Sequence, residues 1–141
     1  MSVPKYWIAV VSKEHALLGV AGGFIQVCHG KQAPLRRMQQ HDWVAIYSPK
    51  QTFAGTERLQ SFTTIGQMID DVVYQFEMTP RFIPFRRNVR FRDCTETPIL
   101  PLIESLRFIP DKKHWGFKFR YGFFEITASD FMFIRNSMLC E

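Results

Sequence analysis

The 141-residue chain has only three cysteines, and their lack of CxxC spacing argues against a disulfide framework or a zinc knuckle. Its four histidines form no H-x-x-x-H or H-E-x-x-H pair, so a zinc hydrolase site has no support in the sequence. The chain also lacks a P-loop, a GxGxxG motif, an apolar run that could span a bilayer, and a secretory leader. We therefore expect a non-catalytic, cytoplasmic protein with no metal, no cofactor and no membrane contact.

Apolar residues, by contrast, are abundant in this chain. Hydrophobic residues make up 46% of the chain and include fourteen phenylalanines, whereas charged residues make up only 22%. A chain of this length can bury roughly 68% of its unfolded surface, and most of the aromatic side chains are needed for that core. The composition thus predicts one folded domain over residues 1–141.

Basic residues exceed acidic ones, with 18 Lys and Arg against 13 Asp and Glu and a net charge of +5. Ordinary solubility explains such a moderate excess as well as nucleic-acid binding does. The arginines, however, occur in clusters at Arg36-Arg37 and Arg86-Arg87, with Arg81, Arg90 and Arg92 nearby. Clustered guanidinium groups suit phosphates, so they favour a nucleic-acid partner.

Runs of β-branched and aromatic residues predict the strands. The main four are expected at Tyr6–Val11, Trp43–Tyr47, Gln60–Gln67 and Phe85–Phe91. Asp71–Phe76 could continue the third strand as one bent ladder with a bulge at Gly66. One or two further strands are expected within Lys118–Ile126.

Helices are predicted from caps and apolar spacing. The four expected segments are Lys13–Val20, begun by Ser12 and ended by Gly22-Gly23; a turn at Leu35–Gln39; a helix from Thr97-Pro98 to about Leu106; and a last helix capped by Thr127 or Ser129. Strands outnumber helices and do not alternate with them regularly. The pattern therefore indicates an α+β mixed barrel rather than a doubly wound sheet.

Seven short blocks follow one another in a fixed order. They are Tyr6-Trp7-Ile8-Ala9-Val10-Val11-Ser12, Gly22-Gly23-Phe24, Cys28-His29-Gly30-Lys31, Asp42-Trp43-Val44-Ala45-Ile46-Tyr47-Ser48-Pro49, Phe62-Thr63-Thr64-Ile65-Gly66, Pro84-Phe85-Arg86-Arg87 and His114-Trp115-Gly116-Phe117. In this order the chain resembles the EVE domain, a compact relative of the PUA and YTH modules, from about Tyr6 to about Ile134. The resemblance implies a PUA-like curved mixed sheet or open barrel flanked by short helices.

The resemblance also implies a pocket for one planar group. Carried onto this sequence, it selects Trp7, Phe24, Tyr47, Ser48, Pro49 and Phe62 as the lining, and we expect them to converge on one concave site. Gln26 and Ser48 carry the donors and acceptors that reading a base edge requires. On residue type alone, each of these aromatics is better explained as core.

Four basic residues are candidates for contacts with a nucleic-acid backbone. Lys31 follows a glycine and precedes a predicted helical turn, which favours an ammonium near an anion. Arg36 and Arg37 lie in that turn. Arg86 and Arg87 point to opposite faces of their strand; we expect Arg86 at an exposed rim and Arg87 beside a buried partner.

These features favour a non-catalytic module that binds DNA or RNA and holds a modified base in an aromatic-lined pocket. The modified-base part is implied by the resemblance alone. A sensor for a small nucleobase, nucleotide or anion is the alternative. An enzyme with a Cys28–His114 dyad is a third reading, less favoured because a small buried cysteine explains Cys28 better.

Overall fold

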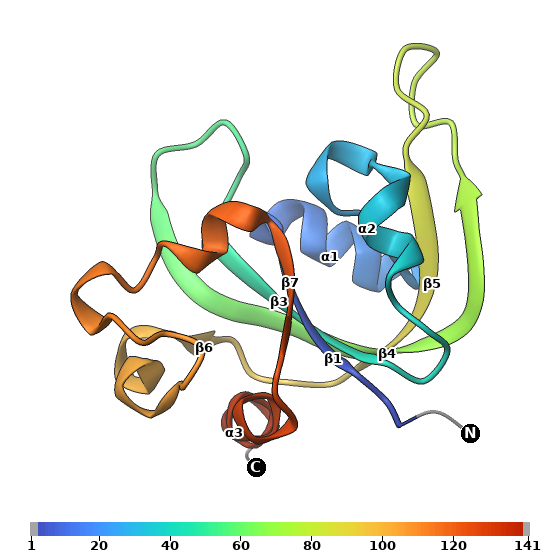
Figure 1. Ribbon diagram of the computed structural model, residues 1–141. Coiled ribbons are helices and arrows are strands. Elements are labelled where there is room, and N and C mark those ends of the chain that lie inside the picture. The colour runs from blue at the N-terminus through green and yellow to red at the C-terminus, as the bar shows by residue number, and fades with distance from the viewer. Residues whose placement is uncertain (1–2, 140–141) are drawn as a thin grey trace.

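The computed structural model describes residues 3–139 and shows an α+β architecture, with a curved open sheet and short helices (Figure 1). Within that range the strands are β1 (Tyr6–Val10), β2 (Phe24–Ile25), β3 (Trp43–Lys50), β4 (Arg58–Gln75), β5 (Phe85–Arg92), β6 (Thr97–Pro98) and β7 (Phe123–Ile126). The four main strands expected from the sequence are confirmed as β1, β3, β4 and β5. The expected fold class is confirmed with them.

The sheet runs in the order β2-β5-β4-β3-β1-β7, and β6 pairs with β4 beside this path. β1 and β3 are parallel, and the other neighbouring pairs are antiparallel. The parallel pair requires a crossover, and the chain makes it through α1, β2 and α2. This crossover carries most of the cavity described below.

β4 is the long bent strand that the sequence allowed, but the bulge at Gly66 is wrong. Gly66 pairs regularly with Phe91, and the register with β5 shifts only between Met68 and Val73. A Cβ on Gly66 would lie 2.6 Å from a methyl of Val89 and 2.9 Å from the carbonyl oxygen of Arg90. Gly66 is therefore explained by the close approach of β5 rather than by a bulge.

The described helices are α1 (Lys13–Gly22), α2 (Gln32–Arg36), α3 (Ala128–Met138) and the 3₁₀ segments η1 (Cys28–Gly30), η2 (Leu100–Ser105), η3 (Lys112–His114) and η4 (Lys118–Tyr121). Gly23 ends α1 in the left-handed conformation with φ of 73°, as expected, and Thr127 caps α3 by accepting a bond from the Asp130 amide. Ser12 precedes α1, but its side chain makes no capping bond.

Three boundaries differ from the sequence expectations. α2 begins at Gln32, before the expected Leu35. Thr97-Pro98 forms β6 instead of a helix cap, and η2 follows it. η4 occupies the first half of the segment expected as strand, leaving only β7. These segments are short, so tertiary contacts outweigh their weak local preferences.

Each face of the sheet has its own apolar cluster. One contains Tyr47, Phe62 and Ile65 and is covered by η2, η4 and α3. The other contains Trp7, Ile25 and Ile46, with residues of α1 and α2 above them. Within residues 3–139, no helix is both long and apolar enough to cross a membrane.

Candidate functional site

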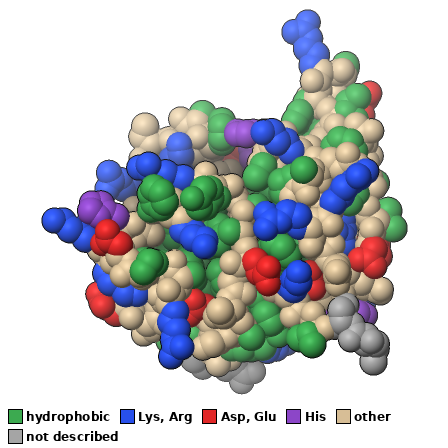
Figure 2. All heavy atoms as spheres, viewed as in Figure 1, with side chains coloured by type: hydrophobic (Ala, Val, Ile, Leu, Met, Phe, Trp, Pro, Cys, Tyr) green, Lys and Arg blue, Asp and Glu red, His purple; other side chains and the backbone are tan. Residues whose placement is uncertain are grey.

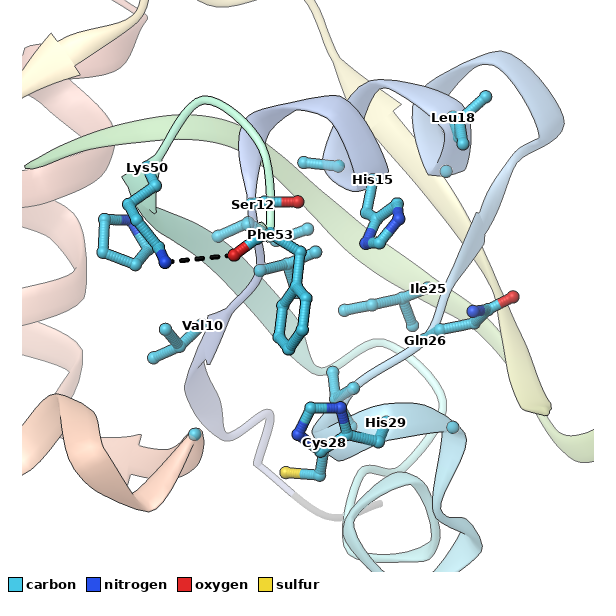
Figure 3. A pocket seen from close by; sticks show the side chains of 18 of the residues that line it. Val10, Ser12, His15, Leu18, Ile25, Gln26, Cys28, His29, Lys50 and Phe53 are labelled. Carbon is cyan, nitrogen blue, oxygen red and sulfur yellow. Dashed lines mark hydrogen bonds between the residues drawn. The ribbon is translucent and has the colours of Figure 1, made fainter. Parts of the chain in front are cut away.

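The second face of the sheet contains a cavity of about 530 Å³. It lies between α1, the segment 24–30 and the loop that joins β3 to β4, and Figure 3 views it from close by. Apolar side chains from β1, β2 and β3, namely Val10, Ile25 and Ile46, form its floor. Its size falls within the range of about 300–1,000 Å³ typical of small-ligand sites.

One wall of the cavity has an unusual backbone. Cys28 and His29 have φ of 49° and 62°, and Gly30 follows with φ of 81°. The left-handed conformation costs roughly 1–2 kcal/mol for each non-glycine residue. A Cβ on Gly30 would lie 2.5 Å from the Cβ of Pro84, so glycine is required there. Strain of this kind concentrates at functional sites, which makes segment 28–30 a candidate contact.

Three rings surround the cavity opening. His15 extends from α1, His29 from η1 and Phe53 from the β3–β4 loop, and Figure 3 shows the Phe53 ring reaching between the two imidazoles. The rings of His29 and Phe53 meet edge to face, with centroids 5.5 Å apart. Phe53 is 62% exposed, so its ring is open to a planar ligand.

The loop that carries Phe53 is held at both sides. Lys50 Nζ donates to the Phe53 carbonyl oxygen over 3.0 Å, and the Glu14 amide donates to the Gln51 carbonyl oxygen over 2.9 Å. The second bond ties the loop to the start of α1. These two hydrogen bonds hold the backbone of the loop and so position the Phe53 ring, although the ring itself is exposed.

The charged groups around the cavity have one sign. Lys50 and Arg120 line it together with the two histidines, and among the described residues no Asp or Glu does. Ser12 also lines it, and its Oγ is buried without a hydrogen-bond partner in the described structure. The cavity therefore combines aromatic rings, positive charge and an unsatisfied hydroxyl, which is chemistry suited to a planar or anionic ligand.

Three of the seven residues expected in the pocket line this cavity: Phe24, Gln26 and Pro49. The Arg86 guanidinium lies 3.6 Å from the Phe24 ring centroid, so one face of that ring is occupied. Arg86 Nε also donates to Gln26 Oε1, and the Gln26 side chain turns toward β5 in Figure 3. Its amide NH2 is then the part of Gln26 left for a ligand.

The other four, Trp7, Tyr47, Ser48 and Phe62, do not line the cavity, so the expected convergence of all the pocket residues is wrong. All four are at most 3% exposed. Tyr47 lies in the opposite cluster from the cavity floor and stacks on Phe119, with centroids 4.2 Å apart. Phe119 lines the cavity, so Tyr47 supports a wall without forming it. A base cage built from Phe24 and Tyr47 therefore fails.

The contacts of these four residues explain their burial. Trp7 Nε1 donates to Asp42 Oδ2 over 2.9 Å, and its ring stacks on Phe123. Ser48 Oγ is bonded to Thr63 Oγ1, and Phe62 packs edge to face on Tyr47. Burial raises the pKa of the Tyr47 hydroxyl, which stays protonated. The pairing of strands in the sheet decides which of these side chains are buried, and the sequence blocks do not specify that pairing.

Arg86 was expected at an exposed rim, and this is wrong: it is 6% exposed and lies between the rings of Phe24 and Phe76. Arg87 is buried, as expected, and donates to the carbonyl oxygens of Leu35, Met38 and Asp70. Desolvation by burial lowers the pKa of both guanidinium groups. Neither arginine is placed to bind a phosphate.

Lys31, Arg36 and Arg37 are exposed, as expected of backbone contacts. Lys31 directly follows Gly30 of the cavity wall. The Arg37 guanidinium lies 5.0 Å from the Trp7 ring centroid and also covers Phe123, so part of its role is packing. Whether these three residues bind an anion stays a prediction.

Cys28 lines the cavity, whereas His114 lines a second hollow and is bonded through Nδ1 to Asp111 Oδ2. Burial raises the pKa of the Cys28 thiol, although nearby Lys31 lowers it in part. Within residues 3–139, His, Cys, Asp and Glu side chains form no group of three that could hold a metal ion.

His15, Phe53, Lys50 and Arg120 were missed from the sequence. The sequence indicates His29 only as part of the block Cys28-His29-Gly30-Lys31. Phe53 had a usable signal, because a lone phenylalanine in a loop bounded by Pro49 and Gly55 has no strand or helix to bury it. His15 and Arg120 had none, since helix and turn surfaces commonly carry such residues.

The structure thus has an open curved sheet with short helices and a ligand-sized cavity over one face. A family model described as the EVE domain matches residues 5–137. The chain therefore belongs to the EVE domain family.

Named relatives agree with this assignment. A UPF0310 protein of Mycobacterium avium is 52% identical over 132 residues, which cover 94% of this chain and 96% of the relative. The UPF0310 protein YdcG of Bacillus subtilis is 43% identical over 134 residues, covering 95% and 92%. A solved structure of a hypothetical protein from Leishmania major is similar in fold alone, with a TM-score of 0.58, 15% identity and coverage of 95% and 94%.

Proposed function

We propose that this EVE domain is a nucleic-acid-binding module that takes a base, turned out of its strand, into the cavity beside His15, His29 and Phe53. The cavity itself carries the proposal: it has the volume of a small-ligand site, exposed aromatic rings at its opening, and cationic groups without a described carboxylate. A base turned out of its strand is held by stacking on such rings and by hydrogen bonds to its edge. The family assignment supports the same reading.

Phe53 is the proposed stacking surface, because its ring is exposed whereas one face of Phe24 is covered by Arg86. The groups proposed to form hydrogen bonds with the base edge are the Gln26 amide NH2, the Ser12 hydroxyl and the imidazoles of His15 and His29. A hydroxyl and an imidazole can each donate or accept, so these groups can form hydrogen bonds with either donors or acceptors on a base edge. Whether the strand is DNA or RNA is left to experiment.

Lys31 and Arg120 are the proposed phosphate contacts nearest the cavity, with Arg36 as a more distant one. Lys31 and Arg120 are both exposed, and Arg120 lines the cavity itself. Arg86 does not take this role because it is buried and bonded to Gln26. Binding without catalysis is proposed because Cys28 and His114, the dyad that the sequence offered, line different hollows.

The test is a binding screen of modified and unmodified oligonucleotides, DNA and RNA, at several salt concentrations. Each phosphate contact on a single strand should lower the logarithm of the binding constant by about 0.7 per tenfold rise in salt. Lys31→Ala should flatten this slope by about 0.7, whereas Lys5→Ala, a change at another exposed lysine, serves as the matched control.

A small-molecule sensor would show the opposite pattern. A free nucleobase or nucleotide would bind as tightly as the oligonucleotide, salt would have little effect, and Lys31→Ala would match Lys5→Ala. That result would replace nucleic-acid binding with the sensor function at the same cavity.

A further inference from the structure

A second hollow of about 630 Å³ lies in the segment 107–121. Its lining includes Phe108, Trp115, Phe117 and Tyr121, together with Arg107 and Lys118. Phe117 and Tyr121 are 59% and 62% exposed, and their rings meet edge to face with centroids 6.3 Å apart. On the left of the view, where this segment lies, Figure 2 shows hydrophobic side chains beside Lys, Arg and His side chains, with acidic side chains among them.

The charge of this segment is strongly positive. Residues 107–121 contain one acidic residue, Asp111, and five basic ones: Arg107, Lys112, Lys113, Lys118 and Arg120. The Asp111 carboxylate accepts bonds from the Lys113 and His114 amides and from His114 Nδ1, and its pKa is lowered chiefly by the His114 side chain. The Asp111 carboxylate is thus hydrogen-bonded within a segment in which five basic residues accompany it.

η4 separates the second hollow from the cavity and belongs to both. Phe119 and Arg120 line the cavity, while Lys118 and Tyr121 line the second hollow. The Arg120 guanidinium also lies 5.7 Å from the Phe117 ring centroid. A strand leaving the cavity over η4 would therefore meet exposed rings and cations without a break.

We infer that this second hollow is a stacking platform for the unpaired nucleotides that flank the base held in the cavity. The inference rests on the proposed nucleic-acid-binding function and extends it to a single-stranded partner. Exposed aromatic rings interleaved with basic groups bind single strands without regard to sequence, because every base presents a ring face and every linkage a phosphate. A duplex hides those ring faces and would gain little from the platform.

The experiment measures binding of unmodified oligothymidylate and oligouridylate of about twelve nucleotides, a length within the range of roughly 4–16 nucleotides for single-strand modules. Phe117→Ala and Tyr121→Ala should each weaken binding about 10-fold. Tyr121→Phe keeps the ring and should bind like the wild type, as should the control Leu100→Ala, whose side chain is 57% exposed outside both hollows. Phe117→Leu keeps apolar packing and should still lose affinity if stacking is the cause.

The outcomes separate this inference from the proposed function. Loss of homopolymer affinity in the ring variants, with an unchanged preference for a modified base, supports the platform. Wild-type affinity in the ring variants overturns the platform and leaves the cavity proposal standing. A change in self-association alone has the same consequence, because it would assign the rings to a contact between proteins. A wild-type protein that binds no oligonucleotide at all overturns both.

Discussion

The two faces of the sheet use similar residues to different ends. On the face of Tyr47 and Phe62, the rings are sealed beneath η2, η4 and α3. On the opposite face, α1 and the segment 24–30 cover β1 and β3 incompletely and leave a cavity. An aromatic residue is therefore a wall or a core residue according to what covers its strand, and the residue type does not decide between them.

The difference arises from the covering segments. α3 places Phe131, Ile134 and Met138 fully buried against the sheet. On the other face, Ser12 before α1 and His15 and Gly19 within it lie along the cavity, and a Cβ on Gly19 would lie 2.4 Å from the Phe24 carbonyl oxygen. Gly19 therefore lets α1 approach β2, while Ser12 and His15 contribute polar groups to the cavity where the other face has a closed apolar core.

The largest expected effect on stability is on the sealed face. Phe62→Ala should lower the free energy of unfolding by about 3–5 kcal/mol, because the ring is fully buried and its loss leaves a void. Urea unfolding measures this change. A loss below about 1 kcal/mol would mean that this face is not close-packed, and the contrast between the faces would disappear.

Gly30→Ala tests the strained wall and should have an intermediate effect. The substitution places a side chain at φ of 81° and against Pro84, so we expect a loss of about 1–2 kcal/mol in unfolding free energy. Gly116→Ala is the matched control, since a Cβ there meets nothing within 4 Å. Equal stability of the two variants would show that segment 28–30 is not held in the left-handed conformation.

Phe53→Ala should have the smallest effect on stability and a clear effect on binding. Because the ring is mostly exposed, unfolding free energy should change by less than about 0.5 kcal/mol. Affinity for the preferred oligonucleotide should fall by about 1–3 kcal/mol if the ring stacks on a base. Fluorescence anisotropy and urea unfolding on the same samples separate the two quantities. Unchanged affinity would remove Phe53 from the site.

The sequence predicted the fold better than the site. Runs such as Trp43–Tyr47 and Phe85–Phe91 carry strong strand preferences, and the strands formed where expected. Lys118–Tyr121 has similar aromatic content but forms a 3₁₀ segment, because Gly122 in the left-handed conformation and the packing of Phe119 set the backbone there. Short segments of this kind are decided by tertiary contacts.

The site was predicted in part. Phe24, Gln26 and Pro49 lie in the cavity, but the order of the blocks does not tell which face of a strand each side chain occupies. Tyr47 and Ile46 are neighbours in the sequence and belong to opposite clusters. Arg86 shows the same limit, since strand parity placed it at a rim while Phe24 and Phe76 enclose it. Knowing the parity of a strand is insufficient until its covering segments are known.

The most direct test of the cavity as the ligand site is an NMR titration of the protein with the oligonucleotide that binds best in the screen. We predict that the largest resonance changes occur at His15, His29 and Phe53, with smaller ones along η4. The buried residues of the opposite face, such as Phe62 and Ile65, should hardly change. Saturable changes that leave those three residues unaffected would contradict the account and place the ligand elsewhere.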